Sequence, residues 1–125
     1  MPLSMNYQIT VTSGFCASHQ LRLYDGSMET LHGHNWTVIL TVAAEKLDEI
    51  GVVMDFHVLE RRLQKVLDPM HNHHLNDVEP FGRTNPSAEN VATHIGQTIR
   101  LPARVRLDSV EVWETPENRC RVTGF

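Results

Sequence analysis

The stretch HNWTVILTVAA, residues 34–44, decides the fold, because its run of Val, Ile, Thr and Trp is typical of a β-strand. Residues 7–13 alternate in polarity and are also rich in β-branched side chains, as a half-buried strand requires. Gly14 permits a bend, after which residues 15–21 continue as strand. The turn signal DGS within residues 22–31 indicates a loop that brings the chain back. We therefore predict that residues 15–21 and 34–44 pair as an antiparallel hairpin.

Two helices are predicted after this hairpin. Asp55 stands where an N-cap belongs, and apolar residues then recur at helical spacing until Pro69. A second helix begins near Ser87 and carries an apolar stripe that ends before Pro102. Residues 70–86 lie between the helices and are rich in His, Asn and Pro, so they predict a long irregular connection of the kind that often carries function.

The C-terminal part returns to strand patterns and completes the fold prediction. Residues 105–115 alternate in polarity, and residues 119–123 are expected to form a short final strand. The order of elements is therefore β-β-α-α-β-β. It predicts an α+β fold, a four-stranded antiparallel sheet with two helices on one face, as a single domain of residues 1–125.

Composition and charge exclude several classes of function. The 125 residues are 41% apolar and 21% charged, as in one globular domain. Eleven Lys and Arg against fifteen Asp and Glu give a net charge of −4 without any basic run, which excludes a nucleic-acid partner. No apolar run approaches the roughly 18 residues of a membrane span, and the N-terminus lacks the layout of a secretion signal. We expect a cytoplasmic protein with no membrane partner.

Eight histidines stand out in this chain, and two of them form the motif His32-Gly33-His34. In an extended segment, residues i and i+2 point to the same side, so both imidazoles can approach one cation. His19 is expected beside them, because it lies near the closed end of the predicted hairpin. Three neutral imidazoles leave one tetrahedral position open, which is typical of catalytic Zn²⁺. Alone, the H-x-H motif is a weak signal whose alternative is a polar loop.

Two carboxylates are candidates for chemistry beside this cluster. Glu29 lies three residues before His32 in the loop of the hairpin, where the alternative is a solvated carboxylate. Glu114 lies at the end of an apolar alternating strand and cannot share a face with Glu111 if the strand is regular. A carboxylate at this strand end can accept paired N–H bonds from an amino-substituted heterocycle, or it can form a surface salt bridge.

The connection between the helices holds His71, His73 and His74. Their imidazoles are suited to general acid or base chemistry near neutral pH, although we expect at least two of the three to be exposed or structural. His57 and His94 lie on the predicted helices and are interpreted as ordinary helix residues.

Taken together, these motifs resemble the 6-pyruvoyltetrahydropterin synthase / 6-carboxytetrahydropterin synthase family. The shared segments, in the family's order and spacing, are FxASH at 15–19, HGHNW at 32–36, VxDF at 53–56, LN at 75–76, NPSAEN at 85–90 and VxET at 112–115. The resemblance runs from about residue 7 to the C-terminus. As a set, H-G-H with an upstream A-S-H, a central D-F and a late E-T is specific.

The resemblance implies the tunnelling fold, in which the sheets of several subunits join into a barrel. Such trimers often stack into hexamers, with active sites at subunit interfaces. It also implies a pterin substrate, 7,8-dihydroneopterin triphosphate, whose amino and ring nitrogens Glu114 anchors. The zinc ligands that it implies are His19, His32 and His34. The predicted substrate contacts are Glu114, Thr115 and Ser87.

Glu29 departs from the familiar family pattern and indicates a particular reaction. Familiar members carry a cysteine a few residues before H-G-H as the proton-abstracting base, whereas this chain has no thiol there and fits an E-x-x-H-G-H variant. Members with that variant resemble enzymes that cleave the substrate's side chain to give 6-hydroxymethyl-7,8-dihydropterin for folate synthesis. The alternatives are 6-carboxytetrahydropterin synthesis for queuosine, an activity like that of 6-pyruvoyltetrahydropterin synthase, or a non-catalytic protein that binds pterin or zinc.

The family's D-H-x-x-L-N motif is altered as well. Aligned without a gap, its Asp and His fall on His71 and Asn72. We therefore expect the acid/base histidine at His71, with His73 as the alternative. The predicted protein is a zinc-dependent lyase that forms homo-oligomers, trimers or hexamers. Its predicted catalytic residues are Glu29, His71 and His73.

Overall fold

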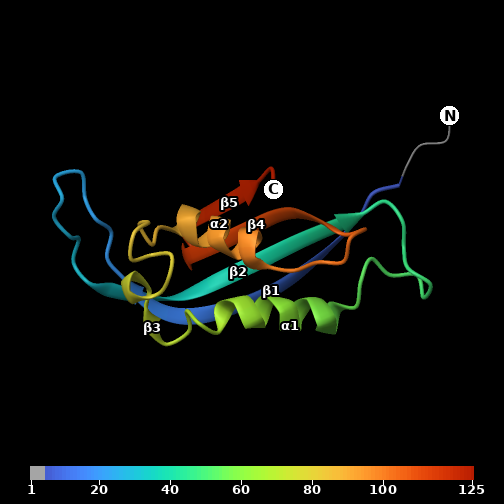
Figure 1. Cartoon of the computed structure of the whole chain (residues 1–125), viewed down its shortest axis with the longest axis horizontal. Coiled ribbons are helices and arrows are strands. Elements are labelled where there is room, and N and C mark those ends of the chain that lie inside the picture. Colours follow the sequence, from blue (N-terminus) through green and yellow to red (C-terminus); the bar gives the residue numbers. More distant parts are fainter. Residues whose placement is uncertain (1–4) are drawn as a thin grey trace.

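In the computed structural model, which describes residues 5–125, a long antiparallel hairpin runs along the molecule (Figure 1). Its strands are β1 (Tyr7–His19) and β2 (His32–Ala44), which pair from Tyr7 opposite Ala44 to His19 opposite His32. The predicted hairpin is confirmed, although β2 begins at His32 instead of residue 34. The first four residues of the predicted domain 1–125 lie outside the described part.

Gly14 does not bend the chain, contrary to the prediction. β1 passes through it without interruption, and the strand expected over residues 15–21 ends at His19. A Cβ atom on Gly14 would lie 2.6 Å from the backbone oxygen of Trp36, closer than real Cβ atoms approach. The glycine is therefore needed for the close approach of two strand backbones.

Across residues 5–125 the sheet has five strands, whereas the sequence predicted four antiparallel ones. Its order is β3-β1-β2-β4-β5, with β4 at Arg106–Thr115 and β5 at Asn118–Thr123. The additional strand, β3 (His73–His74), pairs in parallel with Ala17 and Ser18 of β1. The other neighbours are antiparallel, so the sheet is mixed.

The fifth strand forms because the edge of β1 offers unpaired backbone groups to the connection between the helices. Asn72 adopts a left-handed backbone conformation with a φ of 60°, and its N–H donates to the Cys16 carbonyl at 2.6 Å. The following residues then run alongside β1 and continue into a short 3-10 helix, η1 (Leu75–Asp77). Residues 70–86 are thus less irregular than predicted, because a two-residue strand is too short to show an alternating pattern.

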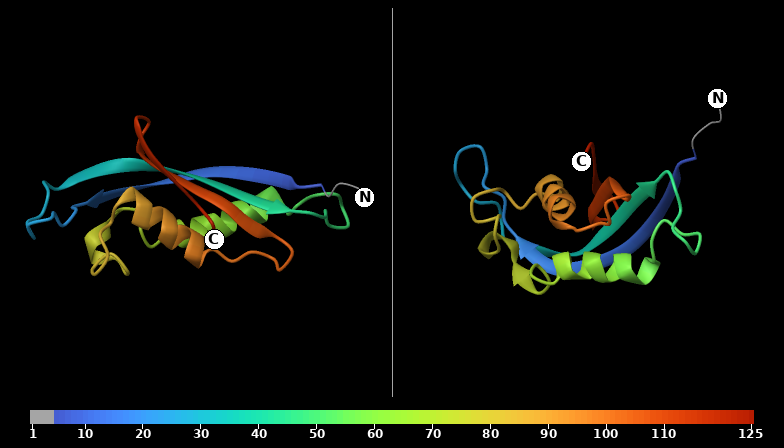
Figure 2. Two further views of the ribbon diagram at one scale, coloured as in Figure 1. Left: turned by 90° about the horizontal axis from the view of Figure 1, so that it is seen from above. Right: turned by 45° about the vertical axis from the view of Figure 1, so that its right-hand side comes forward.

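Both helices pack on one face of the sheet, as predicted (Figure 2). Asp55 caps α1 (Phe56–Leu67) by accepting the N–H of His57 at 2.7 Å. Ser87 caps α2 (Ala88–Thr98) with its hydroxyl in the same way. Both helix starts predicted from the sequence are therefore confirmed. Within residues 5–125, neither helix has the length and apolar character needed to cross a bilayer.

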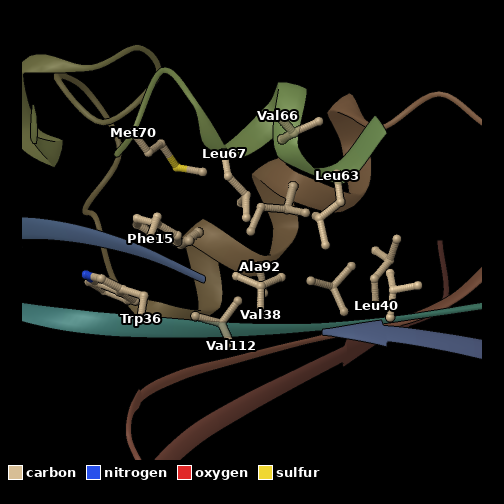
Figure 3. Packing of buried hydrophobic residues seen from close by; sticks show 14 of the residues in the cluster. Phe15, Trp36, Val38, Leu40, Leu63, Val66, Leu67, Met70, Ala92 and Val112 are labelled. Carbon is tan, nitrogen blue, oxygen red and sulfur yellow. The ribbon is translucent and has the colours of Figure 1, made fainter. Parts of the chain in front are cut away.

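One cluster of buried side chains fills the space between the sheet and the helices (Figure 3). Val38, Leu40 and Val42 of β2 are fully buried there, as are Leu59 and Leu63 of α1. Burying one such side chain stabilises the fold by roughly 1.5–3 kcal/mol. A slip of one residue in the hairpin would turn the buried face of β2 to solvent, so this cluster maintains the strand register.

Candidate metal centre and active site

The closed end of the hairpin brings three histidines together. His19 ends β1 opposite His32, which begins β2, and His34 follows on the same face of that strand. The ligand atoms of the three imidazoles all lie within 4.8 Å of one another. The structure therefore unites the three residues that the sequence predicted as metal ligands.

Backbone carbonyls orient two of the rings. His19 Nδ1 donates to the Pro86 carbonyl at 2.7 Å, and His32 Nδ1 donates to the Thr30 carbonyl at 2.8 Å. Because a carbonyl can only accept, each ring carries a proton on Nδ1 and, when neutral, keeps the Nε2 lone pair free. Metal-binding histidines are commonly oriented in this way.

The cluster contains buried nitrogen atoms that a metal ion can bind. His19 is 1% exposed, and among the described residues neither its Nε2 atom nor that of His34 has a hydrogen-bond partner. A buried polar atom without a partner costs about 1–3 kcal/mol. A metal ion bound by these two lone pairs and by the third imidazole would remove this cost.

The surroundings of His34 favour the form of imidazole that binds metals. Burial lowers the pKa of His34 below its ordinary value of 6.5, and the Glu114 carboxylate opposes this effect. The neighbouring imidazoles of His19 and His32 lower this pKa further. His34 is therefore neutral at pH 7, and neutral imidazole is the ligand form.

Two carboxylates flank the cluster. Glu29 Oε1 lies 3.9 Å from His32 Nε2 and accepts the N–H of Leu21 at 3.0 Å. Glu114 Oε2 lies 3.6 Å from His34 Nε2. The side chains of Glu29 and Glu114 are 28% and 25% exposed, so each can also contact a small molecule.

An irregularity in β4 accompanies the position of Glu114. The pairing of β4 with β5 shifts register between Trp113 and Thr115, and Glu114 lies at this shift. Glu111 instead accepts the indole N–H of Trp113 at 2.9 Å. The sequence predicted that Glu111 and Glu114 lie on opposite faces of the strand. The structure identifies Glu114 as the glutamate beside the histidines.

The histidines of the connection lie against β1. His71 Nδ1 accepts the N–H of Cys16 at 3.1 Å, and His73 Nδ1 donates to the His71 carbonyl at 2.7 Å. His73 also lines a cavity of about 450 Å³ that His34 borders. The structure thus brings His73 and His34 to one cavity, while the three clustered imidazoles are those of the hairpin.

The predicted substrate contacts Ser87 and Thr115 use their hydroxyls in local structure. Ser87 Oγ accepts the N–H of Asn90 at 3.1 Å in the first turn of α2. Thr115 Oγ1 accepts the N–H of Asn118 at 3.2 Å in the turn between β4 and β5. Their roles in binding substrate stay predictions.

Sequence reasoning missed the groups that support the site. The Pro86 carbonyl orients His19, and the side chains of Asn76 and Asn85 bond to the backbone of residues 20–22. The shared segments LN and NPSAEN contain these residues and were the available signal. A motif does not say which backbone groups its residues contact, because those partners lie far away in the sequence.

The family model described as 6-pyruvoyl tetrahydropterin synthase matches residues 8–124. The chain belongs to this family. A 6-carboxy-5,6,7,8-tetrahydropterin synthase of Synechocystis is 34% identical over 112 residues, which cover 86% of this chain and 85% of the relative. A dihydroneopterin monophosphate aldolase of Pyrococcus furiosus is 31% identical over 115 residues, which cover 90% of this chain and 94% of the relative.

Solved structures agree with this family assignment. The structure of Caenorhabditis elegans 6-pyruvoyl tetrahydropterin synthase matches with a TM-score of 0.82 and 25% identity, covering 100% of both chains. The predicted α+β fold and family resemblance are therefore confirmed, apart from the fifth strand. The relatives are pterin enzymes by name, which supports the predicted class of pterin side-chain lyases.

Proposed function

We propose that this protein is a zinc-dependent lyase that cleaves the side chain of 7,8-dihydroneopterin triphosphate and gives 6-hydroxymethyl-7,8-dihydropterin. The observation that carries the proposal is the Glu29 carboxylate, 3.9 Å from the His32 Nε2 atom, in the segment where the resemblance leads one to expect a thiol. The Pyrococcus furiosus relative supports the reaction type, because an aldolase of that name cleaves a carbon–carbon bond.

The three histidines and Glu29 have separate roles in this proposal. His19, His32 and His34 would hold the zinc ion, which supplies Lewis-acid polarisation of the side-chain hydroxyls when it is bound. Glu29 accepts the proton of the hydroxyl on the second side-chain carbon. The bond between the first and second carbons breaks, and its electrons pass into the pterin ring. The two-carbon aldehyde leaves with the triphosphate.

The remaining groups orient the ring and return a proton. Glu114 holds the pterin by accepting paired N–H bonds from its amino and ring nitrogens. A histidine of the connection, His71 or His73, then supplies the proton that the first side-chain carbon receives. Ser87 and Thr115 are additional proposed contacts to the substrate.

We propose further that the active protein is a homo-oligomer, a trimer or a hexamer. The hairpin loop beside Glu29 supports this, because it exposes large apolar side chains that another copy can cover. Their exposed fractions are 42% for Leu23, 111% for Tyr24, 44% for Met28 and 56% for Leu31. Light scattering during size-exclusion chromatography measures the number of copies, and a monomer at micromolar concentration would contradict this assembly.

A second candidate function is 6-carboxy-5,6,7,8-tetrahydropterin synthesis, the queuosine reaction. The name of the Synechocystis relative favours it, because that protein is 34% identical over most of both chains. This reaction requires the same metal ligands and the same pterin anchor. The two candidates therefore share the metal ligands and the pterin anchor. They differ in the fate of the side chain and in the base, which is the Glu29 carboxylate in the first candidate and a thiol in familiar family members.

Identification of the product distinguishes these functions. Zinc-loaded protein is incubated with 7,8-dihydroneopterin triphosphate, and the products are identified by mass spectrometry. We expect 6-hydroxymethyl-7,8-dihydropterin. A 6-carboxy product assigns the second candidate, and a pyruvoyl product assigns an activity like that of 6-pyruvoyltetrahydropterin synthase. Tight binding with unchanged substrate identifies a non-catalytic pterin-binding protein.

A further inference from the structure

Two asparagine side chains hold the first residues of the hairpin loop against the connection between the helices. Asn85 Oδ1 accepts the N–H of Arg22 at 2.8 Å, and Asn85 Nδ2 donates to the Arg22 carbonyl at 3.1 Å. Asn76 binds Gln20 in the same two-sided way, accepting its N–H at 3.0 Å and donating to its carbonyl at 2.8 Å. Each amide therefore pairs with a backbone residue as a neighbouring strand does.

These two contacts flank the backbone group that binds Glu29. Leu21 lies between Gln20 and Arg22, and its N–H donates to Glu29 Oε1 at 3.0 Å. The Gln20 side chain also donates to the Glu29 carbonyl at 3.0 Å. The position of the Glu29 carboxylate therefore depends on a three-residue segment whose first and last residues are each held by one asparagine.

The asparagines are themselves fixed by neighbouring structure. Asn76 lies in η1, which follows the short strand paired with β1. Asn85 lies just before α2, and its carbonyl accepts the Asn90 side-chain N–H at 2.9 Å. The backbone carbonyl of the next residue, Pro86, accepts a hydrogen bond from His19 Nδ1 at 2.7 Å. One short segment thus contacts both a metal-ligand histidine and the loop that carries Glu29.

The loop itself has little packing that would position it without these bonds. From residue 22 to residue 31 every residue is exposed or half-buried, and none belongs to the buried cluster. Within the loop, Arg22 forms a β-bridge with Met28, and the Leu23 N–H donates to the Ser27 carbonyl at 2.7 Å. At the base of the loop, the Glu29 N–H donates to the Leu21 carbonyl at 2.9 Å, so Glu29 is tied to the same three-residue segment by its backbone as well. Polar contacts at its base therefore decide where Glu29 lies.

From these contacts we propose that Asn76 and Asn85 are positioning residues, which act on the reaction by holding residues 20–22 and thereby Glu29. The inference rests on the proposed function, in which Glu29 is the base. It goes beyond that function by assigning a role to two residues whose side chains hydrogen-bond to the backbone of residues 20 and 22.

The test is a double-mutant cycle between Asn85 and Glu29, in which the turnover of 7,8-dihydroneopterin triphosphate is measured for each variant. A displacement of about 1 Å at a reacting group can cost about 100-fold in rate, so Asn85→Ala is expected to lower kcat by about 10- to 100-fold. KM should change much less, because Asn85 does not hold the pterin. In the Glu29→Ala background, Asn85→Ala should have almost no further effect on kcat.

Two companion variants separate positioning from folding. Asn85→Asp keeps the acceptor for the Arg22 N–H but loses the donor to the Arg22 carbonyl, so it should lower kcat by less than Asn85→Ala. Gln64→Ala removes an exposed amide of α1 that donates to Asp68, the C-cap of that helix, and it should leave kcat unchanged. Zinc content should be equal in all variants. Hydrogen exchange at Arg22 should accelerate in Asn85→Ala, accelerate less in Asn85→Asp and stay unchanged in Gln64→Ala.

Each outcome bears on the inference. If Asn85→Ala retains full kcat, or lowers it equally with and without Glu29, positioning through Glu29 is wrong while the proposed base is unaffected. If Glu29→Ala itself retains full turnover, the base assignment fails, and the positioning role fails with it. Should Asn85→Ala not fold, Asn76→Ala takes its place in the same cycle, since it removes the equivalent contact to Gln20.

Discussion

The two ends of the β1–β2 hairpin differ sharply, although they belong to the same face of the same two strands. Toward the helix-covered end, Leu40 and Val42 are fully buried among apolar side chains. At the closed end, His19 is 1% exposed and its Nε2 atom, like that of His34, lacks a hydrogen-bond partner among the described residues. One end stabilises the strand register, and the other uses that register to bring imidazoles together.

The site depends on the core for its geometry, whereas the core does not depend on the site for its stability. Buried apolar side chains gain free energy wherever they pack, whereas buried lone pairs without partners cost about 1–3 kcal/mol each. A functional site that weakens the fold locally is expected where selection acts on chemistry. Mutations at the two ends should therefore have opposite consequences for metal binding and stability.

The largest effect is expected for His32→Ala, which should abolish stoichiometric zinc binding while the protein stays folded. Two imidazoles hold zinc far more weakly than three, and the apolar core is left intact because His32 is half-buried and lies outside the buried cluster. Metal analysis after dialysis, together with circular dichroism, measures both properties. The matched control is His57→Ala, an exposed histidine of α1 beside Glu60, which should retain zinc. A fully metallated His32→Ala protein would refute the ligand set.

Glu29→Ala should lower turnover by about 10²–10⁴-fold, the usual contribution of a general base, with zinc content unchanged. The physical reason is that the substituted side chain cannot accept a proton, while the three imidazoles stay in place. Steady-state turnover and metal analysis test this at the functional end of the hairpin. Glu117→Ala, at an exposed turn, is the control and should turn over like the unmodified protein. Undiminished turnover in Glu29→Ala would remove Glu29 from the mechanism.

Leu40→Ala probes the packed end and should lower the free energy of unfolding by about 2–5 kcal/mol. Leu40 is fully buried, so its truncation leaves a cavity between the sheet and α1. Urea unfolding measures the change, and the folded fraction should still bind zinc. Leu47→Ala, at a residue 38% exposed, should change stability far less. Equal losses in the two variants would contradict the division between the ends.

The smallest effect concerns His94 of α2, whose ring packs against Phe81 with centroids 5.4 Å apart. Burial lowers its pKa from the ordinary value of 6.5. At pH values between the pKa of His94 in the folded protein and its higher pKa in the unfolded chain, the unfolded chain binds more protons. The stability that neutral His94 contributes is therefore complete above the unfolded-state pKa and decreases as the pH falls below it. Removing this group should make acid less destabilising.

We therefore expect His94→Gln to lose less stability than the unmodified protein when the pH falls from about 7.5 to about 5.5. Urea unfolding at both pH values measures the difference. His57→Gln, an exposed histidine, should follow the unmodified protein. A pH dependence identical in all three proteins would mean that His94 does not contribute to acid destabilisation.

Local chemistry made much of this molecule predictable. Asp55 and Ser87 cap their helices as expected, because a cap needs only a side-chain oxygen next to free backbone N–H groups. The three histidines were predictable for a similar reason: alternation along a strand places His32 and His34 on one side, and the hairpin brings His19 to them.

Contacts between distant segments were decided only by the tertiary structure. Strand β3 exists because residues 73–74 meet the free edge of β1, and Asn85 holds Arg22 across the same region. Glu114 follows the buried Val110 and Val112 by alternation, but only the pairing of β4 with β2 brings it to within 3.6 Å of His34. Periodicity and capping act within a few residues and can be read along the chain. A backbone partner many residues away exists only after folding has brought the two segments together.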